Sequence, residues 1–276
     1  MNQVSETLDK GLYFRHWPAI NAKSPIKAVV VLIHGLGEHC QRYEHLATHL
    51  NSSGFALSSM DLPCHGQSDG LRGHVNSFDD YEEAVLELIA RTKVLYPDSP
   101  LFLLGHSMGG LIATKLLLNH QDKFAGALLS GAAIQSPQEP PSWQVAIMKV
   151  VAKFLPKAPV LALDASAVSR DPAVVEKYMN DPLISHAKLT AQFLVSMTSA
   201  MEESKEKASL INLPIRIMHG SADVMTAPAG SQLLHDSVSS NDKSITLYDG
   251  LFHEIFNEPE REQIFAEMIS WMNERV

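Results

Sequence analysis

The sequence predicts an α/β protein with a mostly parallel, doubly wound sheet. Short β-branched or apolar runs alternate with longer stretches of helical periodicity, which is typical of strand–helix–strand units. Several runs are continuously apolar, as strands buried on both faces of a parallel sheet are. The alternation stops near residue 135 and resumes near residue 211. We therefore expect a core formed by residues 1–135 and 211–276, with residues 136–210 inserted as a helical cap.

The first half of the chain supplies most of the expected sheet. Residues 11–20 alternate loosely between apolar and polar side chains and are expected to form an edge strand. Buried strands are expected at 28–33, at 55–60, at the apolar run that begins at 101, and at 124–129. Helices are expected at about 42–51, at 78–96 and in the second half of 101–118.

The inserted stretch shows helical rather than strand periodicity. A first apolar stripe comprises Trp143, Ala146, Ile147, Val150, Val151, Phe154 and Leu155, and a second comprises Leu189, Phe193, Leu194, Met197 and Met201. We expect the first stripe to face inward, with Ile147 and Val151 lining an acyl groove. The alternative is that both stripes pack on the main core, as most amphipathic helices do. The sheet then resumes at 213–218 and 244–248, and a last helix covers about 260–273.

The overall composition excludes several classes of protein. The chain has 276 residues, of which 45% are hydrophobic and 19% charged, as in ordinary globular proteins. A net charge of −9 without a basic cluster argues against nucleic-acid binding. The first ten residues lack the apolar core of a signal peptide, and no run is long enough to span a bilayer. Cys40 and Cys64 are too few for a disulfide framework, so we expect a cytoplasmic protein.

One five-residue stretch carries the strongest functional signal. Residues 105–109 read Gly-His-Ser-Met-Gly and match G-x-S-x-G, the strand–turn–helix that exposes the nucleophilic serine of an α/β-hydrolase. An apolar strand precedes the motif and a helical pattern follows it, as that fold requires. Ser107 is therefore the candidate nucleophile, and the N–H of Met108 a candidate oxyanion donor at the helix start. The alternative is a serine that only caps the helix.

A serine nucleophile needs a general base, and the base needs an orienting acid. In α/β-hydrolases these follow in the order Ser, Asp or Glu, His. His253 lies in the loop after the last expected strand, and Asp223 lies in the loop after the preceding one. Asp249 is the fallback for the acid. The loop at 34–37 follows an expected strand and offers the N–H of Leu36 as the second oxyanion donor.

Other motif readings are weaker. Gly35-x-Gly37 could begin a dinucleotide-binding loop, but Cys40 occupies the third glycine position. His45 and His49 lie four residues apart on a helix, but no suitably placed Glu accompanies them. We therefore predict neither a cofactor nor a metal site.

With these residues in hand, the chain resembles the monoacylglycerol lipase family, in the serine-aminopeptidase-like branch of the α/β-hydrolases. The segments that carry the resemblance are HGLGEHCQRY (34–43), HGQSDGLRGHV (65–75), GHSMGG (105–110), YMNDPLI (178–184) and HGSADVM (219–225), and the similarity extends from about Val29 onward. The resemblance implies the same triad and oxyanion donors, and a helical cap with a membrane-contacting, acyl-lined entrance. It also implies that Glu38, Arg42 and Tyr178 lie near the glycerol head group.

Two positions depart from the family pattern. Cys64 stands where the family usually has glycine in its G-H-G-x-S segment. Phe256 stands three residues after His253, where the mammalian lipase has another histidine near the glycerol. The second departure leaves room for other esters. Glu38 and Arg42 could equally form a structural ion pair that holds the oxyanion loop.

The sequence thus predicts a cofactor-independent serine hydrolase that cleaves carboxylic esters of fatty acids, with monoacylglycerols as the first choice. The alternatives in the same class are a lysophospholipase and a general carboxylesterase, with an aminopeptidase less favoured. The alternative from another class is a non-catalytic ligand-binding α/β-hydrolase. The expected partners are a lipid ester and, through the cap, reversible contact with a membrane surface. Neither the oligomeric state nor the acyl chain length is predicted.

Overall fold

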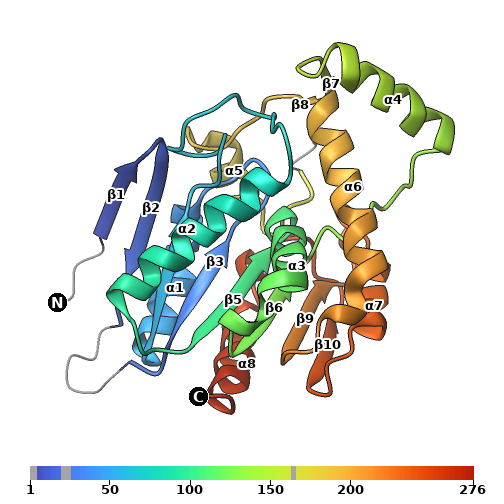
Figure 1. The fold of residues 1–276 in the computed structure, drawn as a ribbon. Coiled ribbons are helices and arrows are strands. Elements are labelled where there is room, and N and C mark those ends of the chain that lie inside the picture. Colours follow the sequence, from blue (N-terminus) through green and yellow to red (C-terminus); the bar gives the residue numbers. More distant parts are fainter. Residues whose placement is uncertain (1–4, 20–25, 163–165) are drawn as a thin grey trace.

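The computed structural model describes residues 5–19, 26–162 and 166–276, and an open sheet runs through its centre (Figure 1). Among these residues the sheet has eight strands in the order β1-β2-β4-β3-β5-β6-β9-β10. The strands are β1 (Ser5–Asp9), β2 (Leu12–Trp17), β3 (Ala28–Ile33), β4 (Phe55–Met60), β5 (Leu101–His106), β6 (Gly126–Ser130), β9 (Ile215–Gly220) and β10 (Lys243–Tyr248). The pairings β1–β2 and β2–β4 are antiparallel and the others parallel. The expected mostly parallel sheet is confirmed.

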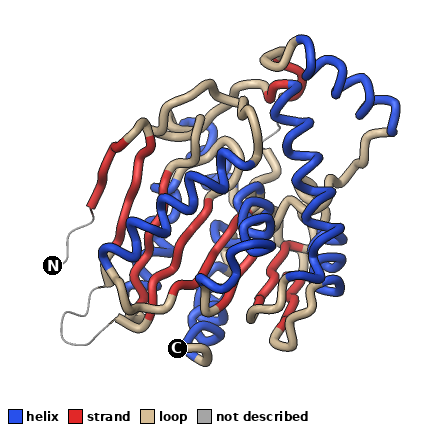
Figure 2. The backbone as a smooth tube through the Cα atoms, viewed as in Figure 1, coloured by secondary structure: helices blue, strands red, loops and turns tan. Residues whose placement is uncertain are grey.

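Helices cover both faces of this sheet (Figure 2). On one face lie α1 (Glu44–Ser52) and α8 (Arg261–Asn273), and on the other lie α2 (Asp79–Leu95), α3 (Met108–His120) and α7 (Pro228–Ser237). Successive side chains of a strand point to opposite faces. In β3 this sends Val29 and Val31 to the α2–α3 side, and Val30 and Leu32 to the α1–α8 side. All four are fully buried, so the continuous apolar run follows from two-sided burial.

The structure corrects the expected edge of the sheet. The edge strand is β1, and β2 pairs on both sides, with β1 and with β4. The sequence of β1, SETLD, is short and polar, so its pattern did not predict a strand. Four short 3₁₀ turns also occur among the described residues: η1 (Cys40–Tyr43), η2 (Gln121–Lys123), η3 (Ala208–Leu210) and η4 (Ile255–Asn257). In that part of the chain no helix is both long and apolar enough to cross a membrane.

Between β6 and β9 the chain forms the elements of the expected cap: α4 (Ser142–Phe154), β7 (Pro159–Leu161), α5 (Pro172–Asn180), β8 (Leu189–Thr190) and α6 (Ala191–Lys207). Helix α6 packs on α3, and α4 packs on the outer side of α6, where it stands away from the sheet (Figure 1). The antiparallel pairing of β7 with β8 was not expected. It joins only two short segments, which leave no periodic signal. The division at residues 135 and 211 into core and cap remains a prediction.

Candidate active site

Ser107 occupies a strained turn between β5 and α3. Its backbone adopts φ +55° and ψ −121°, which non-glycine residues rarely do. A Cβ atom at Gly109 would lie 2.2 Å from the carbonyl oxygen of Ile33, and one at Gly105 would lie 2.5 Å from that of Gly109. Both glycines of the motif are therefore required by close backbone contact. The Ser107 side chain makes no helix-capping hydrogen bond, so the capping alternative is wrong.

Three side chains from distant loops form one hydrogen-bonded chain. The hydroxyl of Ser107 lies 2.9 Å from Nε2 of His253. On the other side of the ring, Nδ1 of His253 donates to Oδ2 of Asp223 over 2.7 Å. His253 follows β10 and Asp223 follows β9, so the loops at the carboxyl ends of parallel strands bring the three together. This is the geometry in which an imidazole can accept the serine proton while a carboxylate holds its tautomer.

Asp223 is held by more than His253. Its Oδ1 accepts the backbone N–H groups of Met225 and Thr226, over 2.7 and 3.0 Å. Its Oδ2 accepts the Thr226 hydroxyl over 2.8 Å and Nε2–H of His219 over 3.0 Å. His219 is fully buried, and its Nδ1 lies 2.7 Å from the hydroxyl of Ser231. Although burial raises the pKa of Asp223, the hydrogen bonds from His219 and His253 lower it strongly, and the group stays ionised.

The base is tuned by its surroundings. Burial by itself lowers the pKa of His253, but the hydrogen bond to Asp223 and the charge of Asp223 outweigh burial and raise it. The ring of His106 lies 4.9 Å from that of His253 between centroids. Burial, and then the neighbouring His253, lower the pKa of His106 to about 4. His106 is therefore neutral where His253 titrates, and it does not oppose a charged imidazolium beside it.

The expected oxyanion donors lie on either side of Ser107. Met108 is the first residue of α3, so its N–H has no acceptor within the helix. Leu36 lies in the loop after β3, and both residues line the same cavity as Ser107. The loop is held in place by Glu38, whose Oε1 accepts the N–H of Gly35 over 2.6 Å. This arrangement can present two N–H groups to a developing negative charge.

A cavity of about 450 Å³ opens from Ser107 toward the cap. Its apolar lining comes mostly from the cap and the oxyanion loop: Leu36, Val145, Met148, Leu161, Val168, Leu189, Leu194, Val195, Met197 and Met201. Such a cavity is suited to an acyl chain. Ile147 and Val151, which we expected in this lining, do not belong to it.

Helix α4 turns a different face inward from the one expected. The inner face carries Val145 and Met148, whereas Ile147 is 54% exposed on the outside. Helix α4 is apolar on both faces, and periodicity cannot tell which of two apolar stripes is buried. The outer stripe, which we call the outer face of α4, consists of Trp143, Ile147, Val150 and Phe154, all exposed.

The three residues expected near the glycerol form a cluster beside Ser107. Glu38 and Tyr178 line the cavity, but Arg42 does not. The Arg42 guanidinium is paired with Glu38 and with Glu254, and it lies 4.6 Å from the ring centroid of Tyr178. The structural ion pair that we weighed for Glu38 and Arg42 is therefore present. Two further residues of the site were not predicted: Glu254, which directly follows His253, and His219, which opens the HGSAD segment.

The remaining sequence candidates lie away from the chemistry. Asp249 is exposed and its contact is with Ser221 rather than with His253, so geometry favours Asp223 as the acid. Phe256 is buried against the ring of His106 and does not line the cavity. Cys64 adopts φ +66°, a conformation that glycine tolerates more easily.

The two helical histidines do not converge. His45 Nε2 lies 2.8 Å from the carbonyl oxygen of Phe256, and His49 Nε2 lies 2.6 Å from a carboxylate oxygen of Glu262. Within the described ranges, no group of three His, Cys, Asp or Glu side chains is arranged to hold a metal ion. These histidines serve contacts between α1 and the elements that follow His253.

Comparisons with known proteins agree with this geometry. The model of a family described as serine aminopeptidase, S33, matches residues 24–260. The monoacylglycerol lipase of Mycolicibacterium smegmatis is 36% identical over 246 residues, which cover 89% of this chain and 88% of the relative. The monoglyceride lipase of Homo sapiens is 33% identical over 267 residues, covering 96% and 87%.

A solved structure gives the same result. The crystal structure of Paleococcus ferrophilus monoacylglycerol lipase superimposes with a TM-score of 0.86 at 32% identity, covering 96% of this chain and 99% of that one. The expected α/β-hydrolase fold is thereby confirmed. The chain belongs to the serine aminopeptidase (S33) family of hydrolases, as the resemblance of its motifs to the monoacylglycerol lipases predicted.

Proposed function

We propose that this protein hydrolyses monoacylglycerols through an acyl-enzyme formed on Ser107. The observation that carries the proposal is the chain of hydrogen bonds from Ser107 through His253 to Asp223, beside an apolar cavity that Ser107 and His253 line. Ser107 attacks the ester carbonyl while His253 accepts its proton and passes it to the leaving glycerol. Water then repeats the sequence on the acyl-enzyme, with His253 again acting as the base.

Electrostatic stabilisation completes the mechanism. The N–H groups of Leu36 and Met108 donate to the oxyanion of each tetrahedral intermediate. Asp223 keeps the proton of His253 on Nδ1 and stabilises the imidazolium as it forms. Its own hydrogen bonds keep it ionised throughout. No step requires a cofactor.

The charges beside Ser107 favour a neutral head group. Glu38 and Glu254 carry two negative charges against the single positive charge of Arg42. A phosphate placed there would meet a net negative charge in a poorly solvated site, where repulsion is strong. The glycerol of a monoacylglycerol carries no charge and meets no such repulsion. A monoacylglycerol therefore fits this site better than a lysophospholipid does.

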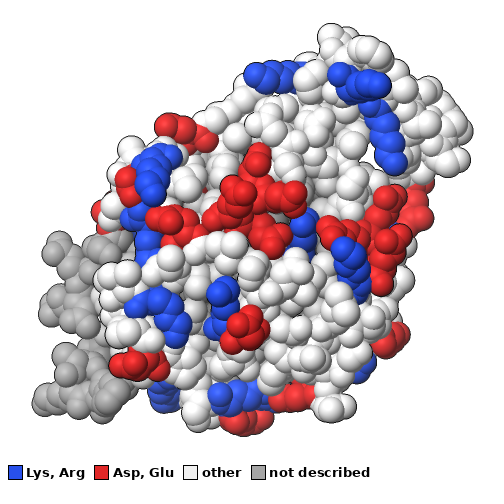
Figure 3. Space-filling model, viewed as in Figure 1, with Lys and Arg blue, Asp and Glu red and all other residues white. Residues whose placement is uncertain are grey.

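The outer face of α4 supports contact with a lipid surface. Four large apolar side chains are exposed there, and the exposed Lys149, Lys153 and Lys157 lie on or just beyond the same helix. Figure 3 shows this end of the molecule as mostly white with scattered blue side chains, while acidic side chains gather below it. Apolar side chains bordered by lysines bind the interface of an anionic bilayer. We propose reversible docking through α4, whose inner residues Val145 and Met148 line the cavity, so that docking brings the cavity close to the lipid that supplies the substrate.

A substrate panel tests the proposed activity. Values of kcat/KM are measured for monodecanoylglycerol, decanoyl lysophosphatidylcholine, p-nitrophenyl decanoate, p-nitrophenyl acetate and leucine p-nitroanilide, with Ser107→Ala as the blank. We expect the decanoyl esters to be preferred over the acetate ester, because each buried CH₂ contributes about 0.8 kcal/mol to binding. We expect monodecanoylglycerol to be preferred over the lysophospholipid because of the negative charge beside Ser107. Equal efficiency on acetate and decanoate esters would identify a general carboxylesterase. A preference for the lysophospholipid, or the absence of ester turnover, would contradict the proposal.

A further inference from the structure

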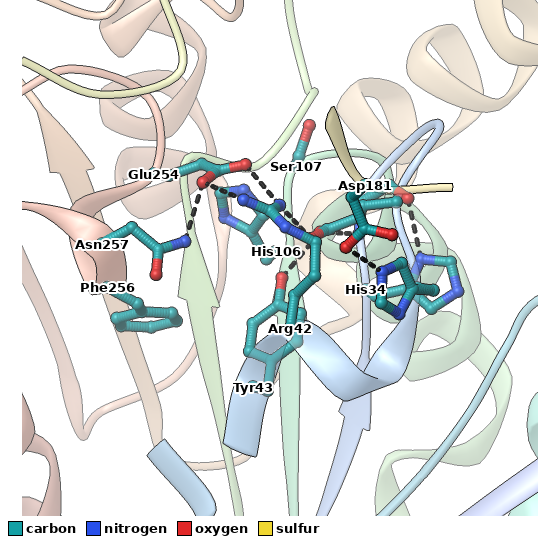
Figure 4. Close-up of polar contacts among 12 residues, drawn as sticks. His34, Arg42, Tyr43, His106, Ser107, Asp181, Glu254, Phe256 and Asn257 are labelled. Carbon is teal, nitrogen blue, oxygen red and sulfur yellow. Dashed lines mark hydrogen bonds and ion pairs between the residues drawn. The ribbon is translucent and has the colours of Figure 1, made fainter. Parts of the chain in front are cut away.

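Arg42 links two loops that both border Ser107. Its Nη1 donates to Oε2 of Glu38 over 2.6 Å and to Oε1 of Glu254, also over 2.6 Å. Its Nη2 donates to Oε2 of Glu254 over 2.7 Å. Figure 4 shows the guanidinium between the two loops, with Ser107 nearby. We call Glu38, Arg42 and Glu254 the carboxylate bridge.

The Glu38 end of the bridge holds the oxyanion loop. Oε1 of Glu38 accepts the backbone N–H of Gly35 over 2.6 Å and the hydroxyl of Tyr43 over 2.7 Å. Gly35 directly precedes Leu36, whose N–H is the expected donor. A shift of the Glu38 carboxylate would therefore move the donor with it.

The Glu254 end holds the base. Glu254 directly follows His253, so the two share a peptide bond. Its carboxylate also accepts the side-chain amide of Asn257 over 2.7 Å, and its backbone N–H donates to the carbonyl of Val168 over 2.8 Å. The position of the His253 backbone is thus tied, through Arg42, to that of the oxyanion loop.

The bridge is buried and charged, which makes it stiff. The exposed fractions of the three side chains are 4% for Glu38, 10% for Arg42 and 5% for Glu254. Burial raises the pKa of Glu38, but the charge of Arg42, together with the nearby His106 and His34 and the hydrogen bond from Tyr43, lowers the pKa to about 2. Charged hydrogen bonds in such surroundings are short and directional, and a two-pronged Arg–carboxylate pair fixes geometry as well as energy. Tyr178 covers the guanidinium from the cap side.

We propose that the carboxylate bridge is a positioning device that fixes the distance between the oxyanion donor of Leu36 and the imidazole of His253. The proposal rests on the proposed serine-esterase chemistry, but it does not depend on the alcohol part of the ester. The bridge acts on the transition state through these two groups, so it raises kcat for any ester that enters the cavity. Glu254 is the residue that completes it.

This role differs measurably from direct recognition of glycerol. Residues that only bind the head group would matter for a glycerol ester and not for a methyl ester with the same acyl chain. A positioning device matters equally for both. The pair of substrates to compare is therefore monodecanoylglycerol and methyl decanoate.

The first variant is Glu254→Gln. It removes one negative charge, leaves Glu38 and Arg42 as a balanced pair, and nearly preserves side-chain volume. We expect kcat to fall by about tenfold to a hundredfold on both substrates, since misplacement by about 1 Å costs on that order. We expect KM to stay within about twofold, because ground-state binding is unchanged. The matched control is Glu267→Gln on α8, which removes a carboxylate paired with Arg216 of β9, outside the cavity lining. This variant should hydrolyse both substrates at rates near those of the wild type.

A second variant distinguishes a loss of positioning from a loss of folding. Glu254→Asp keeps the charge but shortens the reach by one methylene, and it should lower kcat less than Glu254→Gln on both substrates. Thermal unfolding of each variant is compared with Glu267→Gln. A loss confined to monodecanoylglycerol would overturn the proposal in favour of direct glycerol contact, and unchanged kcat in a folded Glu254→Gln would overturn it outright. If wild type hydrolyses only methyl decanoate, the proposed substrate fails while the methyl ester still tests the bridge.

Discussion

Helices α3 and α4 are both 13 residues long and similarly apolar, yet the protein uses them in opposite ways. Ten residues of α3 are buried, whereas in α4 only Ala152 is. Phe154 alone is 72% exposed. Full burial of a large apolar side chain contributes about 1.5–3 kcal/mol to the free energy of unfolding. The buried side chains of α3 therefore stabilise the fold, whereas the exposed side chains on the outer face of α4 contribute little. Helix α3 supports the site at Ser107, whereas the apolar side chains on the outer face of α4 stay exposed, as the proposed contact with a lipid surface requires.

The region around Ser107 is held in place by several contacts that fix the same side chains. Asp223 accepts hydrogen bonds from three side chains. At Gly105 and Gly109 a side chain would collide with backbone oxygens, so only glycine fits at these two positions. Helix α4 lacks such constraints among its described contacts and rests mainly on α6. Substitutions in the first region should therefore change turnover, and substitutions on the outer face of α4 should change only access to aggregated substrate.

The largest effect is expected from Ser107→Ala. Removal of the nucleophile should lower kcat by about a millionfold, since the other triad members cannot act without it. The fold should persist, because alanine keeps the Cβ and the serine hydroxyl makes no capping bond. The check is turnover of a chromogenic ester together with thermal unfolding. Residual activity above about one per cent in a verified, folded sample would mean that another group attacks the ester.

Asp223→Asn should be the next most damaging change. An amide in this position favours the wrong tautomer of His253, and the expected loss in kcat is about ten-thousandfold. Asp249→Asn is the matched control, since Asp249 is exposed and its contact is with Ser221. Steady-state rates of both variants settle the assignment. It is wrong if Asp249→Asn proves the more harmful of the two.

Substitution of His219 tests whether the hydrogen bond that it donates to Asp223 contributes to catalysis. His219→Leu removes a buried donor to a charged group, an interaction that contributes about 1.5–3 kcal/mol, so a loss of about tenfold to a hundredfold is expected. His219→Gln can still donate and should recover most of the rate. The acid limb of the pH–rate profile should shift in the leucine variant and less in the glutamine variant. Identical profiles and rates for the two variants would show that His219 only fills space.

The pH dependence reports the environment of His253. The base works only when neutral, and its pKa is raised because the bond to Asp223 and the charge of Asp223 outweigh burial. Activity should therefore be complete above the raised pKa and fall about tenfold for each pH unit below it. The midpoint of this limb in kcat/KM should lie above about 6.5, the ordinary value for histidine. A midpoint at or below that value would contradict the tight His253–Asp223 contact.

Sequence patterns predicted β3 and the turn at Ser107 because the constraints on both are local. Strand β3 is apolar throughout since both of its faces are covered, and G-x-S-x-G is required by backbone contacts within a few residues. Glu254 and its partner Arg42 lie 212 residues apart in the chain, and no local pattern encodes such a pairing. Strand β1 is polar and is defined by its backbone pairing with β2, which residue types do not reveal.

The sequence could predict that the cap is helical, but not which face of its helix α4 points inward. Apolar spacing indicated a helix near α4, and the structure confirms one over Ser142–Phe154. Both of its faces are apolar, so the choice between them depends on where α6 lies, which is a tertiary contact. Apolar spacing therefore predicted the outer stripe, with Ile147, as the inner one. That error is informative, because an apolar face that the fold leaves uncovered is the basis for proposing lipid contact.

The separation between chemistry and lipid access is tested most directly by a double variant of the outer face, Ile147→Asp with Phe154→Asp. Its kcat/KM is measured on monodecanoylglycerol in anionic phospholipid vesicles and on dissolved p-nitrophenyl butyrate. Leu8→Asp on β1, where Leu8 is 65% exposed, is the control for adding a charge at an exposed apolar site. We expect the vesicle rate to fall about fivefold to tenfold, since partial burial of two side chains contributes only about 1–1.4 kcal/mol, while the dissolved ester is hydrolysed as by wild type. Equal losses in both assays, or no loss in either, would contradict the account.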